Sequence, residues 1–402
     1  MMKVLFLVHQ FFPKSYMGTE RFTLDLAKQA QRMGYNPRVL TYDRSPDRKQ
    51  FEKLTDNVLV RHYRYAGIPV TAVHSRIADA IEIFDHSVAT AVDMLKLDCD
   101  IVHISHPMWV ASVARALKQV RGIPVVMTLT DSWLLCPRGL LDLGCRLCNG
   151  PEAGARCIRC CRFSSKIKSR YEDAKTLFDM ADEVVVASRF VANLFIQNGW
   201  NRKTRIVPHG IDYSNVQVAE CHERSRLTLG FIGSIAWHKG LHVLVKAFRK
   251  VPDDDLRLRI HGSESESSDY YREVLALARP DSRISFLGPF QIDRLPDVMR
   301  DISALVIPST YYEPYPLVML ISLAYNVPVI ASNIGGIPEV IRDGINGLTF
   351  EPGNVDDLVR VIRQLADRPQ ILQMLRSNIT APRRTEEEAL DYDNIYRNLK
   401  PA

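Results

Sequence analysis

The sequence predicts an α/β protein built from at least two domains. The chain has 402 residues, which at about 150 residues per domain gives two or three domains and excludes a single small binding module. Short β-branched runs alternate with segments of helical periodicity, the pattern of parallel strands joined by crossover helices. Hydrophobic residues make up 46% and charged residues 24%, as in globular rather than disordered or fibrous chains.

Two series of apolar, β-branched runs predict two sheets. The first series comprises Val4–Val8, Arg38–Tyr42, Val58–Tyr63, Ile101–Ser105, Val125–Leu129 and Val184–Ala187. The second comprises Leu227–Ile232, Leu256–Ile260, Ile284–Leu287, Ala304–Ile307 and Val329–Ala331. Two α/β halves of similar size suggest paired Rossmann-like domains facing a cleft, and such sheets bind ligands beyond the carboxyl ends of their strands.

A polar segment between the two series marks the linker. Residues 207–212 are followed by the polar stretch 213–225, in which Gly, Pro and charge interrupt any apolar period. We therefore expect an N-terminal domain over 1–212 and a C-terminal domain over 213–382. The tail, 383–402, has apolar residues at helical spacing and predicts a closing helix that can return to the first domain.

Charge and apolar runs bear on partners and location. The formal net charge is +6, which suits an anionic ligand or membrane surface but is too small to imply nucleic acid. The N-terminus has about five consecutive apolar residues, too few for a secretory signal. The apolar run 317–331 is broken by Ser322, Asn326 and Pro328 and is shorter than the ~20 residues that cross a bilayer. We expect a cytoplasmic protein.

A loop with one glycine follows the first predicted strand. It covers residues 12–20, and a helical pattern then runs to Arg32 and stops at Gly34. Gly18 permits close backbone approach and Thr19 can cap the helix, so the helix N-terminus can receive a phosphate group. An ordinary strand-to-helix turn explains the same residues, and on this segment alone we favour it.

The second half contains a similar loop with a cation. In residues 231–240 a strand ends at Gly233, and Lys239 precedes the next helix. A compact ammonium suits a diphosphate. A solvated lysine at a loop tip is an equal alternative for this segment by itself.

A carboxylate and a helix start follow a later buried strand. Residues 308–318 place Glu313 at the carboxyl edge of the sheet, directly before an apolar helix. A carboxylate there can accept hydrogen bonds from sugar hydroxyls, while the amides of Leu317 and Val318 and the helix dipole can hold phosphate oxygens. The glycine turns at 335–339 and 343–347, taken alone, are ordinary turns.

These segments together resemble the family 4 retaining glycosyltransferases of the GT-B fold. The resemblance spans nearly the whole chain. Its matching segments are specific for the family when taken together, but none is specific by itself. Its pieces are Pro13–Glu20, Val207–Asp212, Gly233–Gly240, Pro308–Pro314, Val329–Val340 and Gly344–Phe350. It implies a UDP or GDP sugar bound mostly by the C-terminal domain, an acceptor bound mostly by the N-terminal domain, no organic cofactor and no catalytic requirement for a divalent ion.

The resemblance also assigns roles in donor binding. Lys239 would neutralise the diphosphate, and Glu313 matches the first glutamate of the family's E-x7-E motif, which usually holds the donor sugar. The second glutamate, which usually binds the ribose, is replaced by Ile321. Pro316 replaces the usual glycine before the helix, although proline suits a first helical position. Ser234 stands where many members have an arginine, so Lys239 would have to neutralise more of the negative charge of the diphosphate.

The N-terminal domain departs from the family at two strand ends. Ser105 occupies the position of the family's usual pocket histidine, and His106 is its nearest substitute. Because successive strand residues point to opposite faces, a structural role for His106 is at least as well supported. Thr130 replaces the histidine of a frequent His-Asp pair, and Asp131 at the end of its strand is the better candidate for a catalytic pocket residue.

Six of eight cysteines crowd into residues 136–161, a cysteine-rich insertion beside the acceptor side. Cys145, Cys148, Cys157 and Cys160 form two CxxC pairs that can offer four thiolates to one zinc ion. Cys136 and Cys161 are spare candidates. Reduced packing thiols, redox chemistry and an iron–sulfur cluster are the alternatives.

A cluster of cations follows the cysteines. Its members are Arg159, Arg162, Lys166, Lys168 and Arg170. Anionic lipid head groups or a lipid diphosphate acceptor could bind there, which makes peripheral contact with the inner face of a membrane a candidate property. We favour a solvated helix face.

These observations predict an enzyme that transfers a sugar from a nucleotide diphosphate sugar to a hydroxyl of a glycan or lipid-linked acceptor, with anomeric retention. Two other functions stay open. A nucleotide sugar epimerase of the same fold would process the donor without an acceptor. A noncatalytic binding subunit would explain Ile321, Ser105 and Thr130, where polar groups common in the family are changed or removed.

Overall fold

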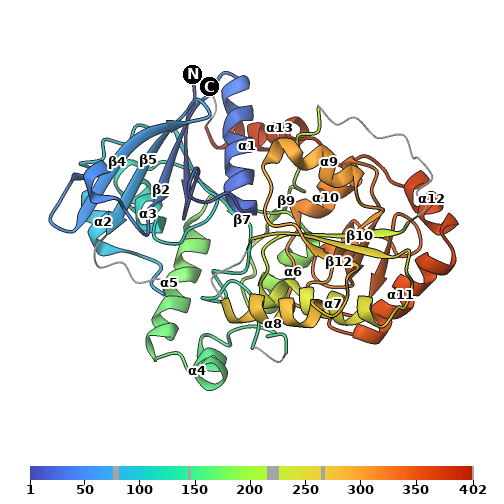
Figure 1. Ribbon diagram of the computed structural model, residues 1–402. Coiled ribbons are helices and arrows are strands. Elements are labelled where there is room, and N and C mark those ends of the chain that lie inside the picture. The colour runs from blue at the N-terminus through green and yellow to red at the C-terminus, as the bar shows by residue number, and fades with distance from the viewer. Residues whose placement is uncertain (76–80, 144–145, 215–225, 264–267, 401–402) are drawn as a thin grey trace. The chain divides into compact units, whose positions relative to one another are not determined.

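The computed structural model describes residues 1–75, 81–143, 146–214, 226–263 and 268–400. The chain divides into two units. Unit 1 is Met1–Gly210 together with Thr385–Ala402, and unit 2 is Ile211–Arg384. Each unit has its own β-sheet with helices around it (Figure 1). The predicted α/β class is therefore confirmed.

The sheet of unit 1 has nine strands in the described part of the chain, in the order β3-β4-β5-β2-β1-β6-β7-β8-β9. Their bounds are β1 (Lys3–Val8), β2 (Asn36–Tyr42), β3 (Glu52–Lys53), β4 (Val58–Tyr65), β5 (Ile68–Ser75), β6 (Ile101–Ile104), β7 (Val125–Leu129), β8 (Glu183–Val186) and β9 (Arg205–Ile206). The neighbours of β1 are β2 and β6, both parallel to it. The chain thus changes direction across the sheet at β1, a point where α/β sheets bind ligands.

The expectation of purely parallel pairing is wrong at one edge of this sheet. β4 pairs antiparallel with both β3 and β5. The two residues between β4 and β5, Ala66 and Gly67, both have positive φ (49° and 83°), as a tight hairpin turn requires. β5 escapes prediction because Pro69, Thr71 and His74 interrupt its apolar pattern.

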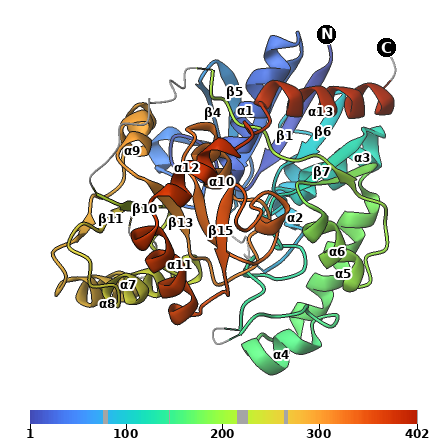
Figure 2. The same ribbon diagram turned by 90° about the vertical axis from the view of Figure 1, so that its right-hand side faces the viewer.

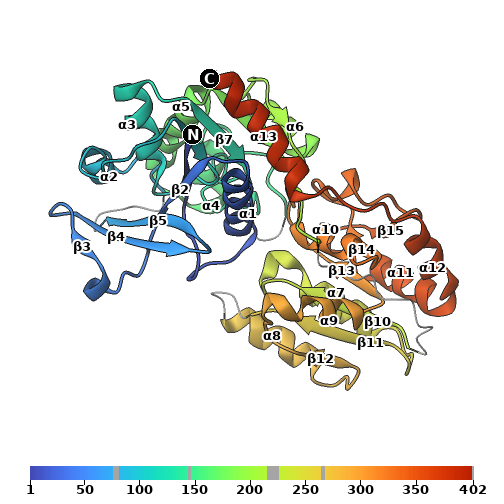
Figure 3. The same cartoon turned by 90° about the horizontal axis from the view of Figure 1, so that it is seen from above.

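The helices of unit 1 include the C-terminal one. They are α1 (Gly18–Arg32), α2 (His86–Ala91), α3 (Ala111–Arg121), α4 (Ala155–Cys161), α5 (Lys166–Met180), α6 (Arg189–Gln197) and α13 (Thr385–Leu399). α13 lies beside α1 although the two are far apart in sequence (Figures 1 and 3). α5 contacts α3 and α4 (Figure 2).

A buried polar network attaches α13 to the sheet. His103 of β6 is fully buried, and its Nδ1 lies 2.5 Å from the Tyr396 hydroxyl. Its Nε2 lies 2.8 Å from Thr128 Oγ1, which in turn lies 2.8 Å from the Tyr392 hydroxyl. Glu388 of the same helix accepts a hydrogen bond of 2.8 Å from the Gly210 amide. Such satisfied buried networks specify how two elements pack.

The sheet of unit 2 has six parallel strands in the described residues, in the order β12-β11-β10-β13-β14-β15. The strands are β10 (Thr228–Ile232), β11 (Arg257–His261), β12 (Ile284–Phe286), β13 (Ala304–Ile307), β14 (Val329–Ser332) and β15 (Gly347–Phe350). The helices are α7 (Leu241–Arg249), α8 (Ser268–Ala278), α9 (Leu295–Arg300), α10 (Leu317–Ala324), α11 (Val355–Asp367) and α12 (Gln370–Ser377). The strand order reverses between β10 and β13, which marks the ligand-binding edge of this unit.

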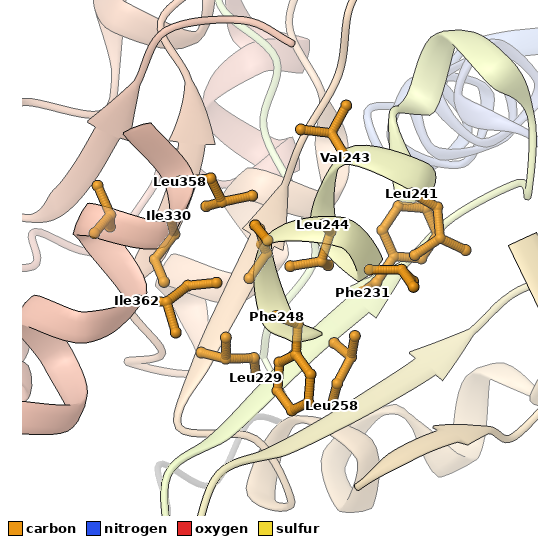
Figure 4. Close-up of a cluster of buried hydrophobic side chains, with 14 of the residues drawn as sticks. Leu229, Phe231, Leu241, Val243, Leu244, Phe248, Leu258, Ile330, Leu358 and Ile362 are labelled. Atoms are coloured by element: carbon orange, nitrogen blue, oxygen red, sulfur yellow. The ribbon is translucent and has the colours of Figure 1, made fainter. Parts of the chain in front are cut away.

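The core of unit 2 lies between the sheet and helices α7 and α11. Leu244 and Phe248 of α7 belong to one buried cluster with Leu229 and Leu258 of the sheet and Ile362 of α11 (Figure 4). All five side chains are fully buried. Burying one side chain of this size stabilises the fold by roughly 1.5–3 kcal/mol, so this layer holds the strand ends in place.

None of the described helices is both long enough and apolar enough to cross a membrane.

Candidate functional site

In unit 2, the loops after β10 and β13 meet at the carboxyl edge of the sheet. The amide of Thr310 donates to the His238 carbonyl across 2.9 Å. A Cβ at Gly240 would lie 1.8 Å from the Pro308 carbonyl oxygen, and Gly240 has φ +69°, so both space and backbone conformation require glycine there. This close approach brings Lys239 of the first loop to Glu313 of the second.

Lys239 and Glu313 form a buried ion pair with a tyrosine between them. The Lys239 ammonium donates to Glu313 Oε1 across 2.8 Å and to the Tyr311 hydroxyl across 2.9 Å. The Tyr311 hydroxyl donates to Glu313 Oε2 across 2.8 Å, and Ser309 Oγ donates to Oε1 across 2.6 Å. An ammonium has three N–H donors, so one remains for an anionic ligand. The Lys239 side chain is 25% exposed.

The charges of this pair support each other. Burial disfavours the Lys239 ammonium, but the Glu313 carboxylate outweighs burial and raises the pKa of Lys239. Burial likewise opposes the Glu313 carboxylate, but Lys239 and the hydrogen bonds from Ser309 and Tyr311 outweigh it and lower the pKa of Glu313. Both groups therefore stay ionised across the neutral range.

Two consecutive glycines hold the backbone of Glu313. The amide of Gly336 donates to the Glu313 carbonyl across 2.8 Å. Gly335 has φ +63°, and a Cβ there would lie 2.3 Å from the same carbonyl oxygen. These glycines belong to a turn that the sequence alone left as an ordinary one. In the structure they position the site carboxylate.

Four of the other predicted donor-binding residues lie on neighbouring loops of unit 2, whereas Gly18 lies in unit 1. Gly233 directly follows β10, and its amide donates to the His261 carbonyl across 3.0 Å. Ser234 follows it and is half-buried. α10 begins at Leu317 after Pro316, so the amides of Leu317 and Val318 belong to the first turn, where N–H groups have no partner within the helix. Ile321 lies one turn further along α10, partly buried.

In unit 1, the structure brings His106 and Asp131 together. His106 is buried, and its Nε2 lies 3.1 Å from Asp131 Oδ2. The amide of Met108 donates to His106 Nδ1 across 3.3 Å, so Nε2 carries the proton and donates to Asp131 when the imidazole is neutral. The Asp131 side chain is 37% exposed, and its Oδ1 accepts the Trp133 amide at 2.8 Å.

Two further residues complete this cluster, and sequence reasoning gave them no role. The His9 ring packs against the His106 ring at a tilt of 41°, with centroids 4.0 Å apart, and His9 Nε2 lies 3.7 Å from Glu20 Oε1. Burial, with the neighbouring positive charges of His106 and Arg44, lowers the pKa of His9 well below its usual value. Burial raises the pKa of Glu20. His9 directly follows β1 and Glu20 lies in the first turn of α1, and these positions were the only features of the sequence that could have indicated a role in the site.

Within the part of the chain that the structure describes, two polar atoms of this cluster are buried without a hydrogen-bond partner: His9 Nδ1 and Glu20 Oε2. Buried polar groups are nearly always satisfied, and leaving one unpaired costs roughly 1–3 kcal/mol.

The predicted cap at the start of α1 is wrong. The helix begins at Gly18, which is exposed, and its N-cap is Met17, which makes no side-chain cap hydrogen bond. Thr19 lies inside the first turn, and its hydroxyl donates to Thr130 Oγ1 across 3.0 Å. Because Thr130 contacts the Ser105 carbonyl at 3.2 Å, these residues tie α1 to the ends of β6 and β7.

Only three of the four cysteines of the two CxxC pairs can be placed in the structure. Cys145 lies outside the described residues. Cys148 and Cys157 are buried, whereas Cys160 is exposed on α4. Within the described ranges, no three His, Cys, Asp or Glu side chains are already arranged to hold a metal ion.

The basic cluster after the cysteines is also smaller than its sequence suggests. Arg170 is 3% exposed and does not belong to a surface patch. Its guanidinium lies 4.5 Å from the centre of the Trp133 ring. Arg159, Arg162, Lys166 and Lys168 are exposed.

Comparison with known proteins identifies relatives in both halves of the chain. The family described as Glycosyltransferase Family 4 matches residues 16–215, and the family described as Glycosyl transferases group 1 matches residues 220–381. An uncharacterized glycosyltransferase of Methanocaldococcus jannaschii is 25% identical over 282 residues, 69% of each protein. A D-inositol 3-phosphate glycosyltransferase of Rhodococcus opacus is 30% identical over 206 residues, 45% of this chain and 44% of that protein. The match thus spans less than half of the latter relative.

Solved structures with the same architecture cover almost the entire chain. Sucrose-phosphate synthase of Thermosynechococcus elongatus has a TM-score of 0.71 at 17% identity and covers 99% of both chains. HepE of Anabaena, solved in complex with UDP and glucose, has a TM-score of 0.71 at 20% identity and covers 98% of this chain and 99% of that one. These likenesses show the GT-B fold. Because the two family matches together span nearly the whole sequence, the chain is a transferase that belongs to the family 4 glycosyltransferases.

Proposed function

We propose that this enzyme moves a sugar from a nucleoside diphosphate sugar, with UDP or GDP as the nucleotide, to a hydroxyl of a glycan or lipid-linked acceptor, with retention of anomeric configuration. The observation that carries the proposal is the Lys239–Glu313 pair at the switch point between β10 and β13. It supplies a cation with one N–H to spare, held by Glu313 four residues before α10 begins. HepE, which shares the fold, is solved with UDP and glucose.

The roles follow from charge and hydrogen-bonding capacity. Lys239 and the amides of Leu317 and Val318 stabilise the negative charge that develops on the departing diphosphate. Glu313 holds Lys239 in place and, through Oε2, can accept a hydroxyl of the donor sugar. Gly233 and Ser234 let the backbone approach the diphosphate.

The chemistry needs no side-chain nucleophile. The bond between the anomeric carbon and the phosphate oxygen breaks, and the acceptor oxygen forms a new bond on the same face of the sugar. The acceptor proton passes to the leaving phosphate oxygen. The protein contributes positioning and electrostatic stabilisation, and this arrangement requires neither an organic cofactor nor a divalent ion for catalysis.

Unit 1 supplies the proposed acceptor site. Asp131 and His106 form a hydrogen-bonded pair at the carboxyl ends of β7 and β6, and the unpaired atoms of His9 and Glu20 lie in the same cluster. These groups can orient an acceptor hydroxyl. The exposed cations Arg159, Arg162, Lys166 and Lys168 are the proposed contact with an anionic membrane at the cytoplasmic face.

The test uses the purified full chain. UDP and GDP sugars are screened for thermal stabilisation, since a ligand that binds the native state raises its unfolding midpoint. The stabilising donor is then incubated with and without candidate acceptors, and NMR of the product gives its anomeric configuration. Transfer with retention supports the proposal. Conversion of the donor sugar without any acceptor indicates an epimerase, and inversion contradicts the mechanism.

Site variants test the residue roles. Glu313→Gln should reduce turnover by about 10²–10³-fold, the usual cost of losing one preorganised electrostatic group. Lys239→Ala should weaken donor binding. Glu273→Gln, an exposed glutamate on α8, is the matched control and should leave both unchanged. Wild-type activity in the Glu313 and Lys239 variants would overturn the assignment.

A further inference from the structure

Four cysteine side chains line one small cavity in unit 1. They are Cys136, Cys148, Cys157 and Cys161. Cys136 lies in the loop after β7, Cys148 lies in the segment before α4, and the other two lie on α4. Three separate stretches of chain thus bring thiols to the same place.

The helical spacing explains why Cys161, and not Cys160, belongs to this set. Cys157 and Cys161 are four residues apart on α4, so they share one face of the helix. Cys160 is exposed, whereas Cys157 and Cys148 are buried. The described cavity therefore favours Cys161 over Cys160 on α4 and adds Cys136 from the loop after β7.

Guanidinium groups surround these thiols. Arg138 and Arg156 line the same cavity. Arg170 of α5 is buried, and its guanidinium donates to the carbonyl oxygens of Trp133 and Leu134. Its Nε has no hydrogen-bond partner, and among the described residues no carboxylate forms an ion pair with it at contact distance. The groups whose negative charge would act on Arg170 are Cys136, Cys157 and Asp131.

A buried cation without a contacting carboxylate is costly unless an anion lies close by. Asp131 is the one carboxylate among the described groups that act on Arg170, and neutral thiols add no negative charge to it. Four thiolates around one divalent ion do, because the assembly carries a net charge of −2. Arg138 and Arg170 supply positive charge near such an assembly, whereas Arg156 of the cavity wall already forms an ion pair with Glu152.

We propose that Cys136, Cys148, Cys157 and Cys161 bind one Zn²⁺ as a structural tetrathiolate site. Each thiol loses its proton to solvent as its sulfur binds the metal, and no oxidation or reduction takes place. The four residues line one cavity, but among the described residues no three side chains are yet close enough to hold an ion, so zinc must draw the sulfurs together. Metal binding is then coupled to a local rearrangement of the described ligand-bearing chain.

The zinc would brace the chain next to the acceptor cluster. A Cβ at Gly139 would lie 3.4 Å from Asp131 Oδ2, so the loop that carries Cys136 passes directly against that carboxylate. Arg170 fixes the other side of the same loop through Trp133 and Leu134. A metal that ties this loop to α4 therefore positions Asp131 without contacting substrate.

Metal analysis of the full-length protein, purified under reducing conditions and reconstituted with zinc, tests the proposal. We expect about one zinc per chain in the wild type and in the controls Cys160→Ser, Cys145→Ser and Cys99→Ser. We expect loss of zinc in Cys136→Ser, Cys148→Ser, Cys157→Ser and Cys161→Ser. A zinc-free wild type, a Cys160→Ser variant that loses zinc while Cys161→Ser keeps it, or bound iron with inorganic sulfide would each overturn it.

Wild-type protein gives a second test that does not depend on folded variants. With Co²⁺ in place of zinc, absorption from thiolate-to-metal charge transfer and intense ligand-field bands of tetrahedral Co²⁺ are expected. Alkylation followed by mass spectrometry should show four cysteines protected in the zinc form and reactive after chelation. Protection of Cys145 and Cys160 in place of Cys136 and Cys161 contradicts the proposed set.

Discussion

The hydroxyl of Tyr311 donates to Glu313 Oε2 across 2.8 Å, and it accepts a hydrogen bond from the Lys239 ammonium at 2.9 Å. The tyrosine therefore fixes both members of the ion pair. Because all three groups lie where the loops after β10 and β13 meet, a small change in Tyr311 should alter donor binding. This relationship leads to the first prediction.

Tyr311→Phe should raise the KM for the donor about tenfold and lower kcat less. The variant leaves Glu313 Oε2 and one N–H of Lys239 without a partner, a cost of roughly 1–3 kcal/mol for a buried group. The ring remains, so the cation–π contact of Lys239 with it, 4.8 Å from the ring centre, is kept. Steady-state kinetics at varied donor concentration measure the split, and Tyr271→Phe on α8 is the control. Unchanged donor KM contradicts the proposed role.

Gly335→Ala tests whether the glycine turn positions Glu313. The new Cβ would lie 2.3 Å from the Glu313 carbonyl at a backbone φ of +63°. Left-handed backbone conformation alone costs an alanine about 1 kcal/mol, and the clash must in addition displace residue 313. We expect turnover to fall by more than tenfold.

Gly344→Ala is a matched control for that variant. Gly344 has φ +71°, and nothing lies within 4 Å of its hypothetical Cβ. It therefore carries the conformational cost without the clash. Equal losses of activity in the two variants, at equal thermal midpoints, would show that displacement of Glu313 is not the cause.

The sequence predicted the parts of the site that depend on local order. Lys239 and Glu313 each follow a buried strand and precede a helix, and chain order alone places them at the carboxyl edge of a sheet. Tyr311 escaped notice because its role depends on a contact with Lys239, about 70 residues away in sequence, and Ser309 because its role is a hydrogen bond to Glu313 that only the folded loop shows. Their signal was weak: two hydroxyls two and four residues before a site carboxylate.

Other differences have equally physical causes. Thr19 has the chemistry of a cap, but the helix starts one residue before it and its hydroxyl bonds to Thr130 on another strand. Arg170 has the charge of a surface residue, yet packing against Trp133 buries it. The sequence did not predict β15, because it begins with Gly347 and glycine is uncommon in strands. The structure requires glycine there, since a Cβ at Gly347 would lie 2.4 Å from the carbonyl oxygen of Val329 on the neighbouring strand. Contacts between residues far apart in sequence determine the structure at these positions, and a local sequence pattern carries no information about such contacts.

The buried His103 should make the stability of unit 1 depend on pH. Burial lowers the pKa of His103 to about 3, against about 6.5 in the unfolded chain. Its contribution is complete above pH 6.5 and is lost as the pH falls toward 3, because the unfolded state takes up the proton first. By linkage the loss at pH 5 is about 2 kcal/mol. Thermal unfolding of the wild type between pH 7 and pH 5 should show it.

His103→Gln removes the titrating ring and should flatten this pH dependence while lowering stability at pH 7. His62→Gln, an exposed histidine on β4, should leave the wild-type slope unchanged. A slope that persists in the His103 variant would assign the effect to another group, such as His9, whose pKa is also lowered by burial.

Glu20→Gln tests the proposed acceptor cluster. Glu20 Oε2 is buried without a partner, and its other oxygen accepts from Ser15 at 2.9 Å. The amide keeps the shape but loses the negative charge, so transfer to the acceptor should fall five- to tenfold, about 1–1.4 kcal/mol. Hydrolysis of the donor by water should change little, because the donor site is unaltered.

The same variant should change the pH dependence of transfer. Burial raises the pKa of Glu20, so protonation of this carboxylate should cause part of the fall in the wild-type transfer rate at acidic pH, and Glu20→Gln should lose that part. Glu52→Gln on the exposed strand β3 is the control. If Glu20→Gln raised the KM for the donor but left the ratio of transfer to hydrolysis unchanged, Glu20 would not belong to the acceptor site.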